Sequence, residues 1–311
     1  MLSRVADSLY WMSRYFERAD HCARVLDANY SLMLNPFKSS RELRWQRIMS
    51  SLGVTAEVDS SDPQTGTVRL IGEARLLSSI IGCVTSAREN ASQVREQISS
   101  EMWERLNQLY HEMIQPSQQH NGDSDPLRLI NVFREGTYRF QGVTDSTMNH
   151  GEGWHFIQVG KYIERASGLS GLLDAQFSMS AGADDLDWVT LLTSCSAFEA
   201  YCKVYTADLK PSAVAEFLLL NPDFPYTVRY SVEQMHNALR VLAGISSARK
   251  TSTIERLIGK LQSSLAYTQI DEIMMRDLHP FLAGIIEQCH RLHAAMHEVY
   301  IEYPIESVFE A

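Results

Sequence analysis

Two glutamate–arginine pairs are the residues of this sequence whose types and positions could do chemistry. Glu17-Arg18 and Glu164-Arg165 each lie inside a long stretch of helically spaced apolar residues, and that spacing calls for apolar side chains where the two arginines stand. A partly buried guanidinium needs a carboxylate or an anionic ligand, because a lone buried charge is very costly. Each pair therefore predicts either an internal ion pair that sets helix register or a polar pocket for a phosphate, carboxylate or peptide ligand.

A further cation precedes each pair. Arg14 and Lys161 stand three residues before the glutamates, a spacing at which helical side chains meet, so we expect them to join the same clusters. We favour internal salt bridges, since structural ion pairs occur as readily as functional ones. In the alternative, an enzyme, Glu17 and Glu164 would be acid/base groups and the arginines would orient a carboxylate.

A second polar cluster is Arg88-Glu89-Asn90, inside a predicted helix over 71–98. Asparagine has poor helix propensity, and a buried amide demands a hydrogen-bond partner. We expect these residues to form a polar network between helices.

The helices also carry the Glu-x-x-His spacing of di-iron bundles. Three pairs have it: Glu152/His155, Glu233/His236 and Glu287/His290. The first pair spans a glycine break, and none recurs at the matching place in the other half of the chain, so we predict no metal and no cofactor. A metal–carboxylate bundle stays as a minor alternative. His290, His293 and His297 share one face of the last helix, which we expect to face solvent.

Long helices must position these residues. Apolar side chains at alternating spacings of four and three predict helices over 2–34 and 154–179, each with two apolar stripes and therefore packed on both sides. The other predicted helices are 41–53, 71–98, 100–115, 126–147, 184–206, 211–220, 226–244, 251–268 and 271–300. Nothing alternates long enough to predict a strand, so the fold class is all-α, a helical bundle.

The two long helices resemble each other at an offset of 147. Residues 15–19 (YFERA) match 162–166 (YIERA), and Leu26-Asp27-Ala28 matches Leu173-Asp174-Ala175. Weaker matches continue in order, among them Leu43-Arg44-Trp45 with Leu186-Asp187-Trp188. We therefore predict two tandem repeats, 1–150 and 151–311, packed as one unit about a pseudo-two-fold axis that brings equivalent residues together.

Composition excludes several classes of protein. The 311 residues carry a net charge of −10, which argues against binding to a nucleic-acid backbone. No apolar run approaches a membrane span, and the first residues lack the apolar segment of a signal peptide. Five scattered cysteines with no CxxC pair predict reduced thiols and a cytoplasmic location. No phosphate-binding loop or nucleophile motif is present.

Several stretches together resemble the alpha-E family of bacterial proteins, over essentially the whole chain. They are LSRVADSLYWMSRYFERADHCARVLD, SARENASQVREQISSEMWERLN, FQGVTDSTM, GWHFIQVGKYIERASGLSGLLD and FLLLNPDFPYTV. The family's Glu-Arg motifs then correspond to Glu17-Arg18 and Glu164-Arg165, and a further motif to Arg88-Glu89-Asn90. Tyr226 departs from the basic residue expected after Phe-Pro, which argues against anion binding there.

The resemblance implies an all-α fold and a genetic context. Such proteins are encoded beside circularly permuted ATP-grasp ligases and transglutaminase-like proteins, in systems thought to make or modify peptides. We therefore expect an accessory protein that binds the ligase or its peptide product, with no nucleic acid or membrane as partner. An enzyme acting on the same peptide or amide is the alternative. The oligomeric state is left open, a homodimer included.

Overall fold

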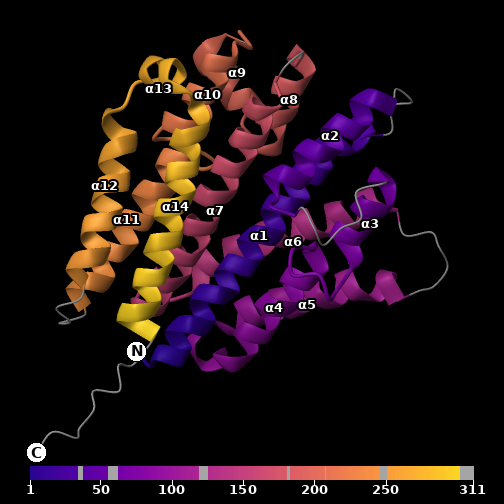
Figure 1. The fold of residues 1–311 in the computed structure, drawn as a ribbon. Helices are drawn as coiled ribbons and strands as arrows, with labels where there is room; N and C mark the ends of the chain where they lie inside the picture. The colour runs from indigo at the N-terminus through magenta and orange to yellow at the C-terminus, as the bar shows by residue number, and fades with distance from the viewer. Residues whose placement is uncertain are drawn as a thin grey trace, which may run out of the picture.

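The computed structural model describes residues 1–33, 38–54, 62–118, 125–180, 183–206, 208–245 and 251–301. Within these ranges the chain forms fourteen α-helices and no strand, which confirms the all-α class (Figure 1). The helices are α1 (Ser3–Met33), α2 (Lys38–Ser51), α3 (Pro63–Gly72), α4 (Ile80–Gln93), α5 (Ser100–Gln118), α6 (Pro126–Thr147), α7 (Glu152–Ser178), α8 (Asp185–Ser194), α9 (Phe198–Tyr205), α10 (Pro211–Leu220), α11 (Val228–Ile245), α12 (Thr251–Tyr267), α13 (Ile270–Arg276) and α14 (Leu278–Met296).

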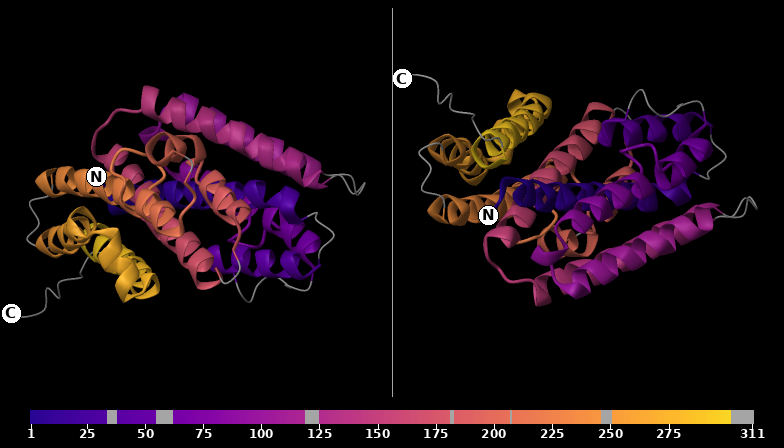
Figure 2. Two further views of the ribbon diagram at one scale, coloured as in Figure 1. Left: turned by 90° about the horizontal axis from the view of Figure 1, so that it is seen from above. Right: turned by 90° about the horizontal axis from the view of Figure 1, so that it is seen from below.

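Helices α1 and α7 form the centre of the bundle, as their two apolar stripes predict. They pack on each other more extensively than any other pair of helices. Helices α4, α5 and α6 lie to one side of this central pair, and α11, α12 and α14 lie to the other (Figures 1 and 2). The helix that follows each central helix crosses over: α2 packs on α7, and α8 packs on α1.

A glycine lets the two central helices approach closely. A Cβ atom added to Gly160 of α7 would lie 2.2 Å from Ser13 Oγ and 2.4 Å from the carbonyl oxygen of Tyr10 on α1. Only glycine fits such an approach of one backbone to another. The contact fixes the height at which the polar residues of α1 and α7 face each other.

The predicted apolar seams form the core. In α1 the seam is buried from Leu9 to Leu26, whereas Tyr30 is half-buried and Leu2, which precedes the helix, is exposed. The seam of α7 is buried in the same way. The buried seam residues are Leu9, Met12, Phe16, Ala19, Ala23 and Leu26 on α1, and Phe156, Val159, Ile163, Ala166 and Leu173 on α7.

The cysteines are unpaired thiols. Cys22, Cys83, Cys195 and Cys289 are buried, and Cys202 is half-buried. Burial raises the pKa of Cys289 to about 11 and that of Cys195 to about 12. The four buried thiols are therefore protonated and unreactive at neutral pH while the fold stays closed.

Three predicted helices are in fact broken, and in each case a local feature separates the two parts. The stretch 71–98 contains the end of α3 and a new helix, α4, whose first turn Ser79 caps by accepting from the amide of Gly82. Ser196, with φ of 49°, separates α8 from α9, and Asp277, with φ of 82°, separates α13 from α14. Apolar spacing continues through these breaks, so it could not reveal them.

None of the helices in the described ranges combines the length and the apolar character needed to cross a membrane.

Candidate functional site

The two Glu-Arg motifs meet at the contact between α1 and α7, and they exchange partners. Glu17 accepts hydrogen bonds from Arg165 through Nε and, at 2.9 Å, through Nη2. Glu164 accepts from Arg14 Nε at 2.8 Å and from Arg18 Nε at 2.7 Å. Arg14 therefore lies in the cluster with its Glu-Arg motif, but the carboxylate that it contacts belongs to the facing helix.

The pair Glu17–Arg165, which we call the closed pair, is shut off from solvent. Its side chains are 3% and 4% exposed. Arg165 also donates to the carbonyl oxygen of Pro225 at 3.1 Å, and its guanidinium lies 4.0 Å from the ring centre of Tyr226. The guanidinium of Arg24 lies at the same distance from that ring. Tyr226, the departure from the family pattern, therefore packs against two cations.

Asp20 and Arg24 extend the closed pair into a buried network that the sequence analysis missed. Arg24 donates to Asp20 at 2.8 Å, to Ser196 Oγ at 2.6 Å and to the hydroxyl of Tyr226 at 2.7 Å. That hydroxyl in turn donates to Asp20 at 2.7 Å. Burial alone would raise the pKa of Asp20, but Arg24 and these hydrogen bonds hold it below its ordinary value. The i, i+4 spacing of Asp20 and Arg24 was the available signal.

Lys161 faces a small cavity of about 30 Å³ on the closed side, together with Glu17 and Asp145. Burial lowers the pKa of this lysine, and the charge of Arg165 acts in the same direction. The cavity leaves room for no more than a water molecule or two. The part of the closed side around Lys161 and Glu17 is thus a packed ionic network without space for a ligand.

The side of Glu164 is different, because it opens into a cleft of about 600 Å³. Arg14, Arg18 and Glu164 form its charged wall, and the three side chains are 13%, 32% and 14% exposed. We call this cavity the open cleft. Its other described lining residues are His21, Cys22, Ser50, Ser51, Leu52, Gly53, Val54, Leu77, Ser78, Ser167, Gly168, Gly171, Ile286 and His290.

Aromatic rings hold the arginines of the open cleft in place. The guanidinium of Arg14 lies 4.7 Å from the ring centre of Trp11, and that of Arg18 lies 5.6 Å from the ring centre of Tyr15. Burial would raise the pKa of Glu164, but the charges of Arg18 and Arg14 hold it below its usual value. A carboxylate that is ionised and held by two arginines is poorly suited to take or give a proton near neutral pH.

Two buried polar atoms in the open cleft have no hydrogen-bond partner among the described residues: His21 Nε2 and Ser78 Oγ. Burial lowers the pKa of His21, so this ring is neutral at pH 7. Gly168 leaves space beside it, since an added Cβ would lie 3.2 Å from the His21 ring. The open cleft therefore offers neutral polar groups next to its charged wall.

The second predicted cluster lies elsewhere and does not join the first. Arg88 donates to Asn107 Oδ1 at 2.7 Å and lies 4.5 Å from the ring centre of Tyr110, which ties α4 to α5. Asn90 donates to the carbonyl oxygen of Ser86 in its own helix at 2.8 Å, and Glu89 is exposed. The three residues thus lie together along the chain without forming one site.

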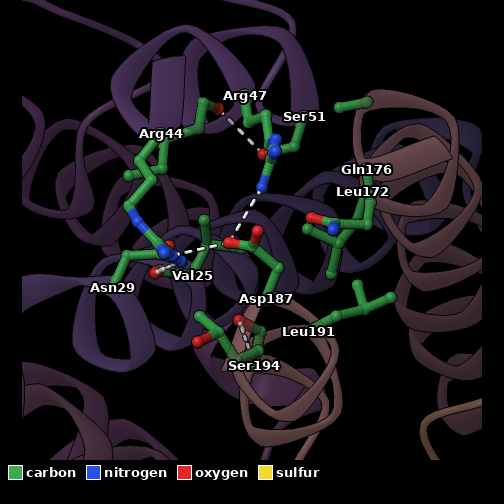
Figure 3. A pocket seen from close by; sticks show the side chains of 13 residues that line it. Val25, Asn29, Arg44, Arg47, Ser51, Leu172, Gln176, Asp187, Leu191 and Ser194 are labelled. Carbon is green, nitrogen blue, oxygen red and sulfur yellow. Dashed lines mark hydrogen bonds and ion pairs between the residues drawn. The ribbon is translucent and has the colours of Figure 1, made fainter. Parts of the chain in front are cut away.

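A third polar group joins α2 to α8 (Figure 3). Asp187 lies 2.7 Å from Arg44 Nη1 and 3.0 Å from Arg47 Nη1, and Arg47 also donates to the carbonyl oxygen of Met179. Asp187 completes the capping box of α8 with Asp184. The adjoining cavity is only about 30 Å³, so these residues hold helices together.

The expected solvent-facing stripe of histidines is only partly present, because His290 is exposed whereas His293 and His297 are half-buried. His293 Nδ1 lies 2.9 Å from the hydroxyl of Tyr10, and the two rings stack. Burial, with Arg14 nearby, lowers the pKa of His293 to about 4. His290 lines the open cleft, and Glu287 pairs with Arg291. In the described ranges no three His, Cys, Asp or Glu side chains gather as a metal site would require.

The fold and the site together define an all-helical protein whose central helices are joined by exchanged Glu–Arg ion pairs. The chain belongs to the Alpha-E family, described as a predicted alpha-helical domain with a conserved ER motif, whose family model matches residues 1–301. The exchanged pairs give that motif a physical role in this chain.

Relatives among curated proteins carry no functional description. The chain is 23% identical over 322 residues to the uncharacterized protein Rv2567 of Mycobacterium tuberculosis and to the uncharacterized protein Mb2597 of Mycobacterium bovis. Each alignment covers 95% of this chain and 36% of the relative, so the chain spans about a third of their length. No solved structure matches the chain significantly.

Proposed function

We propose that this protein acts by binding, as an accessory partner of an ATP-grasp-type ligase that makes or modifies peptides. The observation that carries the proposal is the state of the motif carboxylates. Glu17 is held at both oxygens by Arg165, and Glu164 is held by Arg14 and Arg18. Neither carboxylate is available as an acid or a base, whereas the open cleft beside Glu164 has the volume of a ligand site.

The ligase and the transglutaminase-like protein enter the proposal through the family resemblance. The peptide product of such a ligase carries carboxylates, and the open cleft offers arginines to meet them. The protein would then hold that product, or present it to the next enzyme, in the cytoplasm.

We also propose that the chain arose by duplication of one helical unit, with copies at 1–150 and 151–311. Three contacts support this. Ser13 and Gly160, which align at the offset of 147, touch each other. Arg44 and Asp187, which also align, form an ion pair. The Glu-Arg motifs exchange partners reciprocally. Contacts between equivalent residues are the signature of a two-fold axis.

Co-purification tests the accessory role. The tagged protein is expressed with an ATP-grasp ligase of the kind that the family resemblance implies, and ligase turnover and product length are measured with and without the protein. We expect a stable complex, or a change in rate or product. If nothing co-purifies and the ligase behaves identically in both assays, the accessory role is wrong.

A further inference from the structure

The open cleft carries an uncompensated positive charge. Arg14 and Arg18 face it, and Glu164 is the one acid among its described lining residues. The closed side is balanced by contrast: its three cations are matched by three acids. The cations are Lys161, Arg165 and Arg24, and the acids are Glu17, Asp20 and Asp145. One half of the central ion-pair system is therefore complete, and the other lacks one negative charge.

Arg18 is the residue able to accept that charge. Its Nε donates to Glu164, but its terminal Nη1 and Nη2 groups make no hydrogen bond to the described residues. These two N–H donors lie in one plane, and such a fork matches the two oxygens of a carboxylate. The Arg18 side chain is 32% exposed, so a ligand in the cleft can reach its guanidinium. The hydrogen bond from Arg18 Nε to Glu164 holds the guanidinium in place.

The rest of the open cleft suits a peptide chain. Its unpaired polar atoms, His21 Nε2 and Ser78 Oγ, need partners, and a peptide backbone supplies both donors and acceptors. Leu52, Leu77 and Ile286 add apolar lining for side chains. A volume of about 600 Å³ is within the range of pockets that take ligands well beyond the size of a single ion.

We propose that the open cleft binds a short peptide through a carboxylate seated on the free end of Arg18, with His21 and Ser78 hydrogen-bonded to the peptide backbone. This rests on the proposed binding function and names its ligand class. One carboxylate balances the cleft's excess of one positive charge. A phosphate group carries about −1.5 to −2 at neutral pH and would leave a surplus of negative charge.

Binding of three synthetic peptides tests the proposal by calorimetry. The peptides are acetyl-Ala-Ala-Leu with a free carboxylate, the same peptide as its amide, and the amide of acetyl-Ala-Glu-Leu. We expect the first or the third to bind, and the plain amide to bind at least about tenfold more weakly, because it lacks the charged hydrogen bonds. Equal binding of all three, or of none, overturns the proposal, as does binding of inorganic phosphate alone.

Variants of the same helix locate the site. Arg18→Gln should weaken binding of the carboxylate peptide on the order of tenfold to a hundredfold. Arg18→Lys keeps the charge but loses the two parallel N–H donors, so its affinity for the carboxylate peptide should lie between those of the wild type and Arg18→Gln. Arg4→Gln, at an exposed position of α1, is the control and should bind like the wild type. If Arg18→Gln retains its circular dichroism spectrum and still binds normally, the cleft is not the site.

The two proposals fail separately. Normal peptide binding without any effect on the ligase would overturn the accessory role and leave the carboxylate site standing. An effect on the ligase that survives Arg18→Gln, with no peptide bound by either protein, would overturn the carboxylate site alone.

Discussion

At the scale of single residues, burial separates the two glutamates of the motif. Glu17 is held by one arginine in a buried, two-pronged pair, whereas Glu164 is shared between two arginines at the edge of the open cleft. A buried pair whose partner is removed leaves a charge that neither water nor protein compensates. The same substitution should therefore have unequal effects at the two positions.

Glu17→Gln should lower the free energy of unfolding by about 3–5 kcal/mol, because it leaves the Arg165 guanidinium buried without a counter-charge. Denaturant unfolding followed by circular dichroism measures the loss. Glu135→Gln is the control, since its ion pair with Arg139 is exposed and should be worth no more than about 1 kcal/mol. A loss at Glu17 as small as that of the control would contradict a structural role for the closed pair.

His293 should make the fold sensitive to mild acid. The pKa of His293 is lowered from 6.5 to about 4 in the folded protein, so the unfolded chain binds the proton first as pH falls. The contribution of His293 to the free energy of unfolding is therefore fully present above pH 6.5 and is lost as the pH falls from 6.5 to about 4. His293→Gln should therefore show a smaller fall in unfolding free energy over that window. His21, whose pKa is also lowered, keeps some slope in the variant.

The acids act at lower pH. The pKa values of Asp20 and Glu164 are lowered from 3.8 and 4.5, so their contribution is present above those values and disappears below them. Comparing the pH profiles of wild type and His293→Gln cancels the contribution of these acids and that of Asp7, whose pKa is raised by burial. An identical pH profile for wild type and His293→Gln would show that His293 is not buried as described.

The site was predictable in part. Arginines standing where apolar residues belong identified Arg18 and Arg165, and spacing added Arg14 and Lys161. The exchange of ion-pair partners between α1 and α7 was not predictable, because the spacing of apolar residues along one helix does not indicate which carboxylate of the facing helix its arginines will contact. Nor could spacing indicate that one pair would be closed by Tyr226 and the other left open.

At the scale of helices, the approach of α7 to α1 at Gly160 should be essential. Gly160→Ala places a methyl group 2.2 Å from Ser13 Oγ and against the backbone of α1, so the helices must separate. We expect a loss of about 1–3 kcal/mol or more. Gly142→Ala in α6 is the matched control, because its methyl group would meet open space and should gain about 0.5–1 kcal/mol from helix propensity.

Unfolding curves of the two glycine variants would decide this point. A Gly160→Ala variant as stable as the control would mean that α1 and α7 do not touch there.

Most helices were predictable, and their breaks were not. Long, strongly periodic segments identified α1 and α7 to within two residues at the ends that the structure describes. The break at Asp277 depends on one residue with positive φ, and apolar spacing continues through it into α14. The position of this break is determined by tertiary packing, and the local sequence indicates it only weakly.

At the scale of the whole molecule, the two halves share one core. Helix α1 belongs to the first half and α7 to the second, yet their contact is the most extensive between any two of the described helices. Either half alone would expose the apolar stripe that the other covers. We expect 1–150 expressed alone to lack fixed tertiary structure, as seen by near-ultraviolet circular dichroism and rapid proteolysis, and the full chain to unfold in one transition. A folded, protease-resistant half would contradict a shared core.

Labelling of the buried thiols can report whether the two halves open together or one after the other. Cys22 and Cys83 belong to the first half, and Cys195 and Cys289 to the second. An alkylating reagent can reach them only when the chain opens, so mass spectrometry of partly labelled protein records the sequence of openings. If the bundle opens as one body, molecules will carry either none of these four labels or all of them. A population labelled only at the two cysteines of one half would instead identify the half that opens first.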